Sequence, residues 1–302
     1  MTKKESGIIF DKVAIIGIGL IGSSIAKAIK KTQISNNISG YAKTHKTRQK
    51  VRELGYIDCV ENDLVSAIKD ADLIILCVPV GSNREILQEI SSSLKKGSIL
   101  TDVGSVKAEV IHQISDLIPH GVSFIPGHPI AGTEFSGPES GFAELLEDKW
   151  CILTPYGDFD KNSLNKVKSF WERIGMLVDI MEAEQHDLIL AITSHIPHLI
   201  AYNIVGTATD LEKVTKKQVT QYAAGGFRDF TRIASSDPIM WRDVFLNNKE
   251  AVLEMLGRFM EDLTDLQKAI RWKDGKKLEE LFTKTRKIRQ GIIKEEKERS
   301  SK

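Results

Sequence analysis

The sequence predicts an α/β protein in which a doubly wound parallel sheet comes first and an all-helical domain follows. Short apolar runs alternate with helical patterns over residues 12–181, as in a parallel sheet covered by helices. Strand signals stop at residue 182, where long helical patterns take over. A length of 302 residues is enough for two domains, so we predict one at 1–181 and a second at 182–302.

The composition is that of an ordinary globular protein. Hydrophobic residues make up 41% and charged residues 27%, and 42 Lys and Arg against 41 Asp and Glu leave a net charge of +1. Because both signs are mixed along the chain, no nucleic-acid surface is expected. No apolar run matches the roughly 18–20 residues of a membrane span, and residues 1–11 lack the apolar region of a secretion signal. The predicted location is the cytoplasm, with no membrane partner.

The three cysteines, Cys59, Cys77 and Cys151, are too few and too scattered for a disulfide framework. None has a second Cys or a His at metal-ligand spacing. We therefore expect them to be buried small hydrophobic residues in a reducing compartment, and we predict no metal site.

Seven strands are expected in the first half, most of them as continuous aliphatic runs typical of strands buried on both faces. They are 13–16, 38–41, 73–78, 99–103, 122–125, 150–153 and 177–180. Helical patterns fill the intervals at 23–30, 46–54, 83–94 and 164–174.

The second half is predicted to contain three long helical segments, 182–207, 241–272 and 275–299. Residues 188–205 are so apolar that a helix there must be buried nearly all round. We therefore expect this helix to pack against a partner subunit as well as against its own domain.

The first strand runs into the glycine-rich turn Gly17-Ile18-Gly19-Leu20-Ile21-Gly22, which opens the first helix. This is the context that a dinucleotide-binding (Rossmann) fingerprint requires. Gly17 permits the tight turn, Gly19 lets the backbone approach a pyrophosphate, and Gly22 lets helix and strand pack closely. A purely structural turn is the alternative. Leu20 and Ile21 are counted with the cofactor-binding residues, as are Val78 and Pro79 at the end of the predicted strand 73–78.

The end of the second strand bears on the choice between NAD and NADP. An acidic residue normally accepts hydrogen bonds from the adenosine ribose there, but this sequence has Ala42, Lys43 and Thr44. Without the carboxylate, the loop can accommodate a 2′-phosphate, which favours NADP slightly. The alternative is that these residues are simply solvated at the start of a helix.

Polar residues follow two later strands, at the edge where open α/β sheets bind ligands. Asp102-Val103-Gly104-Ser105-Val106-Lys107 ends one strand and starts a helix, and Gly127-His128-Pro129 follows the next strand. His128, between Gly and Pro, does not lie in a regular helix, so its side chain is free to face a cleft. It is either a turn histidine or a catalytic group, and its position near the nicotinamide site favours the second.

In the helical half, His195 and His198 lie three residues apart, on one helical face. Zinc binding lacks a third ligand, which leaves a structural role or substrate contact. Arg228 and Arg232 lie four apart after a glycine pair. They form either a surface salt-bridge pair or a fork of guanidinium groups for carboxylates.

These motifs, in this order, resemble the prephenate and arogenate dehydrogenase family over about residues 12–268. The resemblance is carried by the Gly17 fingerprint, Gly104-Ser105-Val106-Lys107, Gly127-His128-Pro129-Ile130-Ala131-Gly132, Ser194-His195-Ile196-Pro197-His198, and residues 225–241.

The resemblance implies oxidative decarboxylation of prephenate to 4-hydroxyphenylpyruvate, or of arogenate to tyrosine, in tyrosine biosynthesis. His128 would accept the proton of the ring hydroxyl, Ser105 would orient His128 and the nicotinamide, and Arg232 would hold the ring carboxylate. Further substrate contacts implied by similarity are His198, Arg228, Trp241, Thr133, Glu134 and His195. Family members form homodimers through their helical domains.

Two other functions fit the sequence less well. A β-hydroxyacid dehydrogenase would need a catalytic lysine where this sequence has His195 and His198. A redox-sensing nucleotide-binding protein would leave Ser105, His128 and Arg232 without a common purpose.

Overall fold

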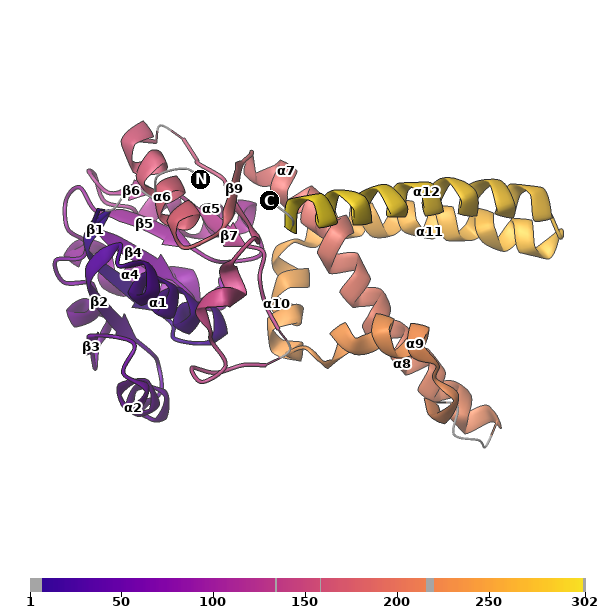
Figure 1. Ribbon diagram of the computed structural model, residues 1–302, viewed down its shortest axis with the longest axis horizontal. Coiled ribbons are helices and arrows are strands. Elements are labelled where there is room, and N and C mark those ends of the chain that lie inside the picture. The colour runs from indigo at the N-terminus through magenta and orange to yellow at the C-terminus, as the bar shows by residue number, and fades with distance from the viewer. Residues whose placement is uncertain (1–6, 134, 158, 216–219, 301–302) are drawn as a thin grey trace. The chain divides into compact units, whose positions relative to one another are not determined.

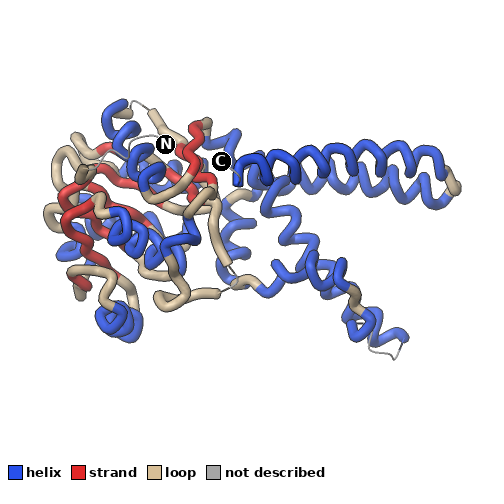
Figure 2. The backbone as a smooth tube through the Cα atoms, in the orientation of Figure 1, coloured by secondary structure: helices blue, strands red, loops and turns tan. Residues whose placement is uncertain are grey.

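The computed structural model describes residues 7–133, 135–157, 159–215 and 220–300. The chain forms two compact units, which meet in the sequence at Lys249 and Glu250. Within the described residues every strand precedes residue 181, and the chain from Ala183 onward is helical (Figures 1 and 2). The functional boundary at 181/182 stays a prediction.

The main sheet is parallel and doubly wound, as predicted, with the strand order β3-β2-β1-β4-β5-β6 (Figure 1). Its strands are β1 (Phe10–Ile16), β2 (Ser35–Tyr41), β3 (Cys59–Val60), β4 (Leu73–Leu76), β5 (Ile99–Asp102) and β6 (Ser123–Phe124). The helices of this half are α1 (Leu20–Thr32), α2 (His45–Leu54), α3 (Leu64–Ile68), α4 (Asn83–Ile90), α5 (Ala108–Ile114) and α6 (Lys161–Arg173). The order reverses between β1 and β4, which is where such sheets bind ligands.

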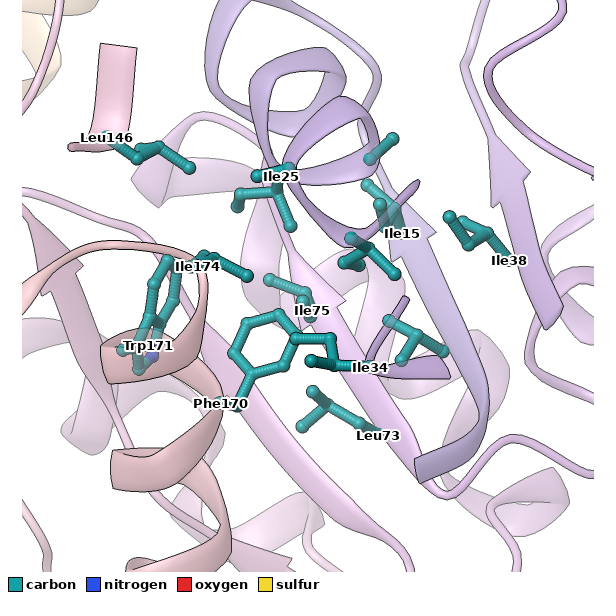
Figure 3. Close-up of a cluster of buried hydrophobic side chains, with 14 of the residues drawn as sticks. Ile15, Ile25, Ile34, Ile38, Leu73, Ile75, Leu146, Phe170, Trp171 and Ile174 are labelled. Atoms are coloured by element: carbon teal, nitrogen blue, oxygen red, sulfur yellow. The ribbon is translucent and has the colours of Figure 1, made fainter. Parts of the chain in front are cut away.

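Alternate residues of the central strands point to opposite faces of the sheet, and both faces are buried in apolar clusters. Ile15 and Ile75 belong to one apolar cluster, together with Phe170 of α6 (Figure 3). Ile16 and Ile74 belong to a second cluster, with residues of α3, α4 and α5. This explains why the strands are continuous aliphatic runs.

One prediction about the sheet is wrong. Strands β8 (Trp150–Leu153) and β9 (Leu177–Ile180) do not continue the parallel sheet but form a second one with β7 (Gly127–Pro129), in the order β7-β8-β9. Strand β7 is antiparallel to β8. It escaped prediction because it is three residues long and has no apolar run. As a result His128, expected in a loop, lies in a strand and is only 8% exposed.

One more strand of the first half was not predicted, and one expectation about the cysteines needs correction. The strand β3 has only two residues, too few for a recognisable pattern. It carries Cys59, which is exposed, whereas Cys77 is half-buried and Cys151 is buried. All three thiols are free, but the expectation that all three would be buried was wrong for Cys59, since an edge strand leaves it open to solvent.

The first long helical segment is continuous but irregular. It consists of α7 (Ala183–Leu190), a π-helical turn (Ala191–His195) and α8 (Ile196–Thr215). Ala183–Leu211 is long and apolar enough, by length and composition, to cross a membrane, so the expectation that no stretch reaches that length was wrong. The core helix of a soluble protein passes the same test. In the single chain the helix is not buried all round, because side chains such as Leu188, Ile192 and Ile204 are exposed.

The second predicted helix is two helices. In place of the single helix expected at 241–272, the chain forms α10 (Pro238–Asn247) and α11 (Lys249–Arg271). They are preceded by α9 (Gly225–Thr231) and a 3₁₀ turn (Arg232–Ser235). The break falls at Asn248, whose side-chain amide forms hydrogen bonds with distant segments of the chain. The third segment is helical as predicted, as α12 (Gly275–Ser300).

Candidate active site

The three fingerprint glycines have different surroundings, and each fits its expected role. Gly17 has φ of +94°, and a Cβ there would lie 2.4 Å from the Cys77 carbonyl oxygen. A Cβ at Gly22 would lie 2.2 Å from the Gly17 carbonyl oxygen. At Gly19, by contrast, a Cβ would meet nothing within 4 Å. The turn therefore requires glycine at two positions for packing, and at the third it leaves space for a ligand.

The start of α1 offers hydrogen-bond donors to that space. Gly19 is the N-cap of α1 and provides no capping side chain, and the first turn has no acidic residue. The amide groups of this turn and the positive end of the helix dipole suit a pyrophosphate. Val78, which follows β4, lies against Gly17, where its Cγ1 would be 2.8 Å from an added Cβ. These residues fit a dinucleotide at the switch point between β1 and β4.

A substitution at Gly19 is expected to weaken cofactor binding without lowering the stability of the fold. Gly19 has φ of −94°, which any residue adopts. We expect Gly19→Ala to leave the thermal unfolding temperature within about 2 °C while weakening NAD(P) binding about tenfold or more, since a methyl group intrudes on the pyrophosphate. Fluorescence titration with NADH or NADPH measures the binding. Gly22→Ala, which clashes with backbone, should instead lower the unfolding temperature, and unchanged binding by Gly19→Ala would contradict the assignment.

The loop after β2 is held by its own side chains. Ala42 is buried, and Lys43 and Thr44 are exposed. The Thr44 hydroxyl caps α2 by accepting the amide of Thr47 at 3.1 Å. The Arg48 guanidinium donates to the carbonyls of Ala42 and Lys43 at 2.7 and 3.0 Å. Thr44 thus has a structural function whether or not a phosphate binds, and Lys43 is an exposed cation of this loop.

A buried ion pair joins the two polar segments beyond β5. The Lys107 ammonium donates to the Asp102 carboxylate, and both side chains are almost completely buried. Asp102 accepts the amides of Gly104 at 2.8 Å and Gly127 at 3.2 Å. Lys107 also donates to the Gly127 carbonyl at 2.7 Å. One carboxylate therefore binds both the loop that carries Ser105 and the strand that carries His128.

His128 is buried next to a second histidine. Its Nδ1 lies 2.8 Å from Nε2 of His186 in α7, and the two rings meet edge to face at 70°. Burial, together with the positive charges of its surroundings, holds the pKa of His128 well below 6.5. A neutral imidazole has one nitrogen free to accept a proton, so this residue has the chemistry of a general base.

His195 is connected through Asn248 to Asp187, the neighbour of His186 in the sequence. Its Nδ1 is 3.1 Å from the Asn248 amide nitrogen, which also donates to the Asp187 carbonyl at 2.9 Å. Burial lowers the pKa of His195 to about 4. Its Nε2 is buried and has no hydrogen-bond partner among the described residues. Because Nδ1 accepts from Asn248, this Nε2 carries the proton and can donate to a ligand.

His198 and Trp241 form a stacked pair, with ring centroids 3.7 Å apart and planes at 24°. Nδ1 of His198 lies 2.9 Å from the Ser194 carbonyl. The pKa of His198 is lowered, mainly by burial and also by the charge of Arg232. Trp241 packs against Val106 of the loop after β5. The helical segment is thus connected directly to the loop that carries Ser105.

The remaining predicted site residues are more open. Ser105 is half-buried, and Arg228, Arg232 and Thr133 are exposed or partly exposed. Arg228 lies in α9, whereas Arg232 begins the 3₁₀ turn that follows. Glu134 lies outside the described residues.

Several residues of the site were not assigned a role from the sequence: Asp102, Lys107, His186, Asp187 and Asn248. The adjacent pair His186 and Asp187, directly before the apolar run that begins at Leu188, was the signal that could have drawn attention to α7. Among the described residues no group of three or more His, Cys, Asp or Glu side chains is placed to hold a metal ion.

The sheet order, the glycine turn and a buried neutral histidine on a strand bonded to the end of β5 define the class of protein, an NAD(P)-dependent oxidoreductase with a Rossmann-type domain. Two family models match the chain: the prephenate dehydrogenase nucleotide-binding domain at residues 25–179 and the prephenate dehydrogenase dimerization domain at residues 182–284. The chain belongs to the prephenate dehydrogenase family.

Similar proteins agree with this placement. The chain is 42% identical to cyclohexadienyl dehydrogenase of Zymomonas mobilis, over 93% of this chain and 96% of that protein. It is 32% identical to prephenate dehydrogenase of Bacillus subtilis, over 93% of this chain and 76% of that protein. The crystal structure of prephenate dehydrogenase from Aquifex aeolicus with hydroxyphenyl propionate and NAD+ is similar with a TM-score of 0.88 and 36% identity, over 93% of this chain and 98% of that one.

Proposed function

We propose that this protein is a prephenate dehydrogenase, which converts prephenate to 4-hydroxyphenylpyruvate with loss of carbon dioxide, and that arogenate is the alternative substrate. The observation that carries the proposal is the buried, neutral His128, whose strand is bonded to Asp102 at the end of β5, in a chain similar to prephenate and cyclohexadienyl dehydrogenases over nearly its whole length.

In this proposal His128 moves one proton. A bound nicotinamide supplies the hydride acceptor. Nε2 of His128 accepts the proton of the ring hydroxyl as that carbon becomes a carbonyl. Loss of carbon dioxide then makes the ring aromatic, and His128 returns the proton to the phenolate oxygen, so the histidine ends neutral. Ser105, on the loop joined to His128 through Asp102, orients the hydroxyl and the nicotinamide.

Recognition of the two carboxylates of prephenate falls to the helical segment. We assign the ring carboxylate to Arg232, whose charge already acts on His198, and the side-chain end to His195, His198, Arg228 and Trp241. Thr133 and Glu134 are assigned to the mouth of the pocket. The Nε2 proton of His195 is well suited to a carboxylate or keto oxygen, because no group of the described part of the chain accepts it.

Removing the Arg232 guanidinium should weaken substrate binding. We expect Arg232→Ala to raise KM for prephenate about 10- to 100-fold, the value of one charge-assisted pair, with a smaller change in kcat. Arg242→Ala removes an exposed arginine of α10 that pairs with the next residue, Asp243. It is the matched control and should leave KM unchanged. An unaltered KM in Arg232→Ala would remove this residue from the site.

We propose NADP as the preferred cofactor, with NAD as the alternative. The preference rests on Lys43, exposed after β2, and on the lack of a carboxylate among residues 42–44. A steady-state assay that crosses prephenate and arogenate with both cofactors tests substrate and cofactor together. A kcat/KM for NAD well above that for NADP would show that Lys43 does not contact a 2′-phosphate, and turnover of neither substrate would refute the proposed function.

We also propose that the protein is a homodimer. The match of residues 182–284 to a dimerization domain supports a second copy of the chain, rather than lipid, as the cover of the exposed apolar side chains of α8. Light scattering on protein purified without detergent tests this, and a monomer at micromolar concentration would contradict it.

A further inference from the structure

A chain of three side chains ends at the proposed base. Nδ1 of His128 lies 2.8 Å from Nε2 of His186, and Nδ1 of His186 lies 2.8 Å from Oδ1 of Asp187. His186 is fully buried, and Asp187 is 5% exposed. The two histidines come from different segments, β7 and α7, so the contact is made by the tertiary fold.

The directions of these hydrogen bonds follow from the chemistry of the groups. An ionised carboxylate only accepts, so the Nδ1 that faces Asp187 carries a proton. Burial lowers the pKa of His186, which keeps the ring neutral. Its Nε2 is therefore an acceptor, and Nδ1 of His128 must donate to it. In neutral His128 the lone pair is then on Nε2, the nitrogen that points away from His186.

Asp187 is itself fixed by the protein backbone. Its Oδ1 and Oδ2 accept the amides of Lys107 and Ala108 at 2.8 and 2.9 Å. Its carbonyl accepts the Asn248 amide. The first two bonds hold the carboxylate at the start of α5, and the third holds the Asp187 backbone to the residue that follows α10. The carboxylate therefore has little freedom to turn away from His186.

We propose that His186 and Asp187 are positioning residues that hold His128 in the tautomer with Nε2 free, and that they stabilise the imidazolium formed when His128 accepts the substrate proton. The inference rests on the proposed function for the identity of the base. No proton moves between the three side chains: Nδ1 of His128 keeps its proton and its hydrogen bond to His186 while Nε2 gains the substrate proton. The Asp187 carboxylate faces the resulting positive charge through the His186 ring.

Two substitutions at His186 separate the direction of hydrogen bonding from packing. Glutamine presents an acceptor oxygen and a donor NH₂ side by side, so His186→Gln can accept from His128 and donate to Asp187. Methionine, of similar size, can do neither. We expect His186→Met to lower kcat about 10²-fold or more, within the range for general base catalysis, and His186→Gln to retain kcat to within about tenfold, with KM for prephenate changed less than about threefold in both.

Substitution of Asp187 should reverse the hydrogen bonds. In Asp187→Asn the side-chain amide can donate to Nδ1 of His186, and the His186 ring then carries its proton on Nε2. Nδ1 of His128 must accept from that Nε2, so the proton of neutral His128 moves to its own Nε2, the nitrogen that would accept the substrate proton. In a serine protease triad the same carboxylate-to-amide change, which leaves the histidine in the wrong tautomer, costs about 10⁴-fold in kcat. We expect a loss of at least about 10²-fold here, as for removal of a general base.

Thermal unfolding of each variant shows whether the fold is kept. The two His186 variants are expected to keep it, because Asp187 retains its hydrogen bonds to the amides of residues 107 and 108. Wild-type kcat in His186→Met would overturn the proposal. So would equal losses in His186→Met and His186→Gln, because packing alone would then explain them.

A spectroscopic readout keeps the inference separate from the proposed function. The tautomer of each histidine is visible in ¹⁵N–¹H correlation spectra, and the His128 signals are identified by their loss in His128→Gln among the seven histidines of the chain. We expect a protonated Nδ1 and a bare Nε2 for His128 at pH 7, exchanged in Asp187→Asn. The titratable groups facing the pair are Lys107, Asp102 and His195. A protonated Nε2 in the wild type would overturn the proposal, whereas a wild type that turns over neither substrate but shows this tautomer would refute only the function.

Discussion

His128→Ala is expected to lower kcat by about 10² to 10⁴, because it removes the group that accepts the proton of the substrate hydroxyl. The dissociation constant for NAD(P) should stay within about threefold, since the dinucleotide contacts lie at β1 and β4. Steady-state kinetics with prephenate and a fluorescence titration with reduced cofactor measure the two effects. Turnover close to that of the wild type would rule out His128 as the base.

A surface histidine provides the control for that experiment. The side chain of His112 in α5 is 85% exposed, so His112→Ala should leave both kcat and cofactor binding unchanged. If both variants lost activity equally, the loss would reflect general damage to the protein and not removal of a base.

The pH dependence of the wild type follows from the burial of His128. The residue accepts a proton only when it is neutral, so activity falls as the pH drops through its pKa. Because burial holds that pKa well below 6.5, kcat/KM should still be undiminished at pH 6.5, and its acidic limb should lie lower. An acidic limb centred at or above pH 6.5 would contradict the buried, neutral base.

Local patterns were enough to predict the parts of the site that depend on short stretches of chain. The Gly17–Gly22 turn was recognisable because its glycines follow a strand and open a helix, and the parallel sheet was recognisable because strands buried on both faces are continuous aliphatic runs. His128 was found from its neighbours in the sequence, although its strand was not.

The rest depended on contacts between distant segments. Nothing near Asp187 in the sequence indicates that its carboxylate binds amides 79 and 80 residues away. The break at Asn248 is a tertiary effect as well, because the side-chain amide of that residue bonds to Asp187 and His195. The second sheet was missed because β7 has too few residues to show a period.

Lys107→Met is expected to destabilise the protein by about 3–5 kcal/mol, the cost of leaving a buried charge without its partner. The Lys107 side chain is 0% exposed, and its removal leaves the Asp102 carboxylate, 1% exposed, without an opposite charge. Equilibrium unfolding in urea at pH 7 measures the change. The loss should also reach the active site, since the pair joins the Ser105 loop to the strand of His128.

Two variants show whether the buried charge is the cause. Lys168→Met makes the same substitution in an exposed ion pair with Glu172 and should change stability by less than about 1 kcal/mol. Asp102→Asn added to Lys107→Met removes the unpaired charge while keeping an oxygen for the amides of Gly104 or Gly127, so it should recover a large part of the lost stability. A Lys107→Met variant no less stable than Lys168→Met, or no recovery in the double variant, would show that packing and not charge governs this site.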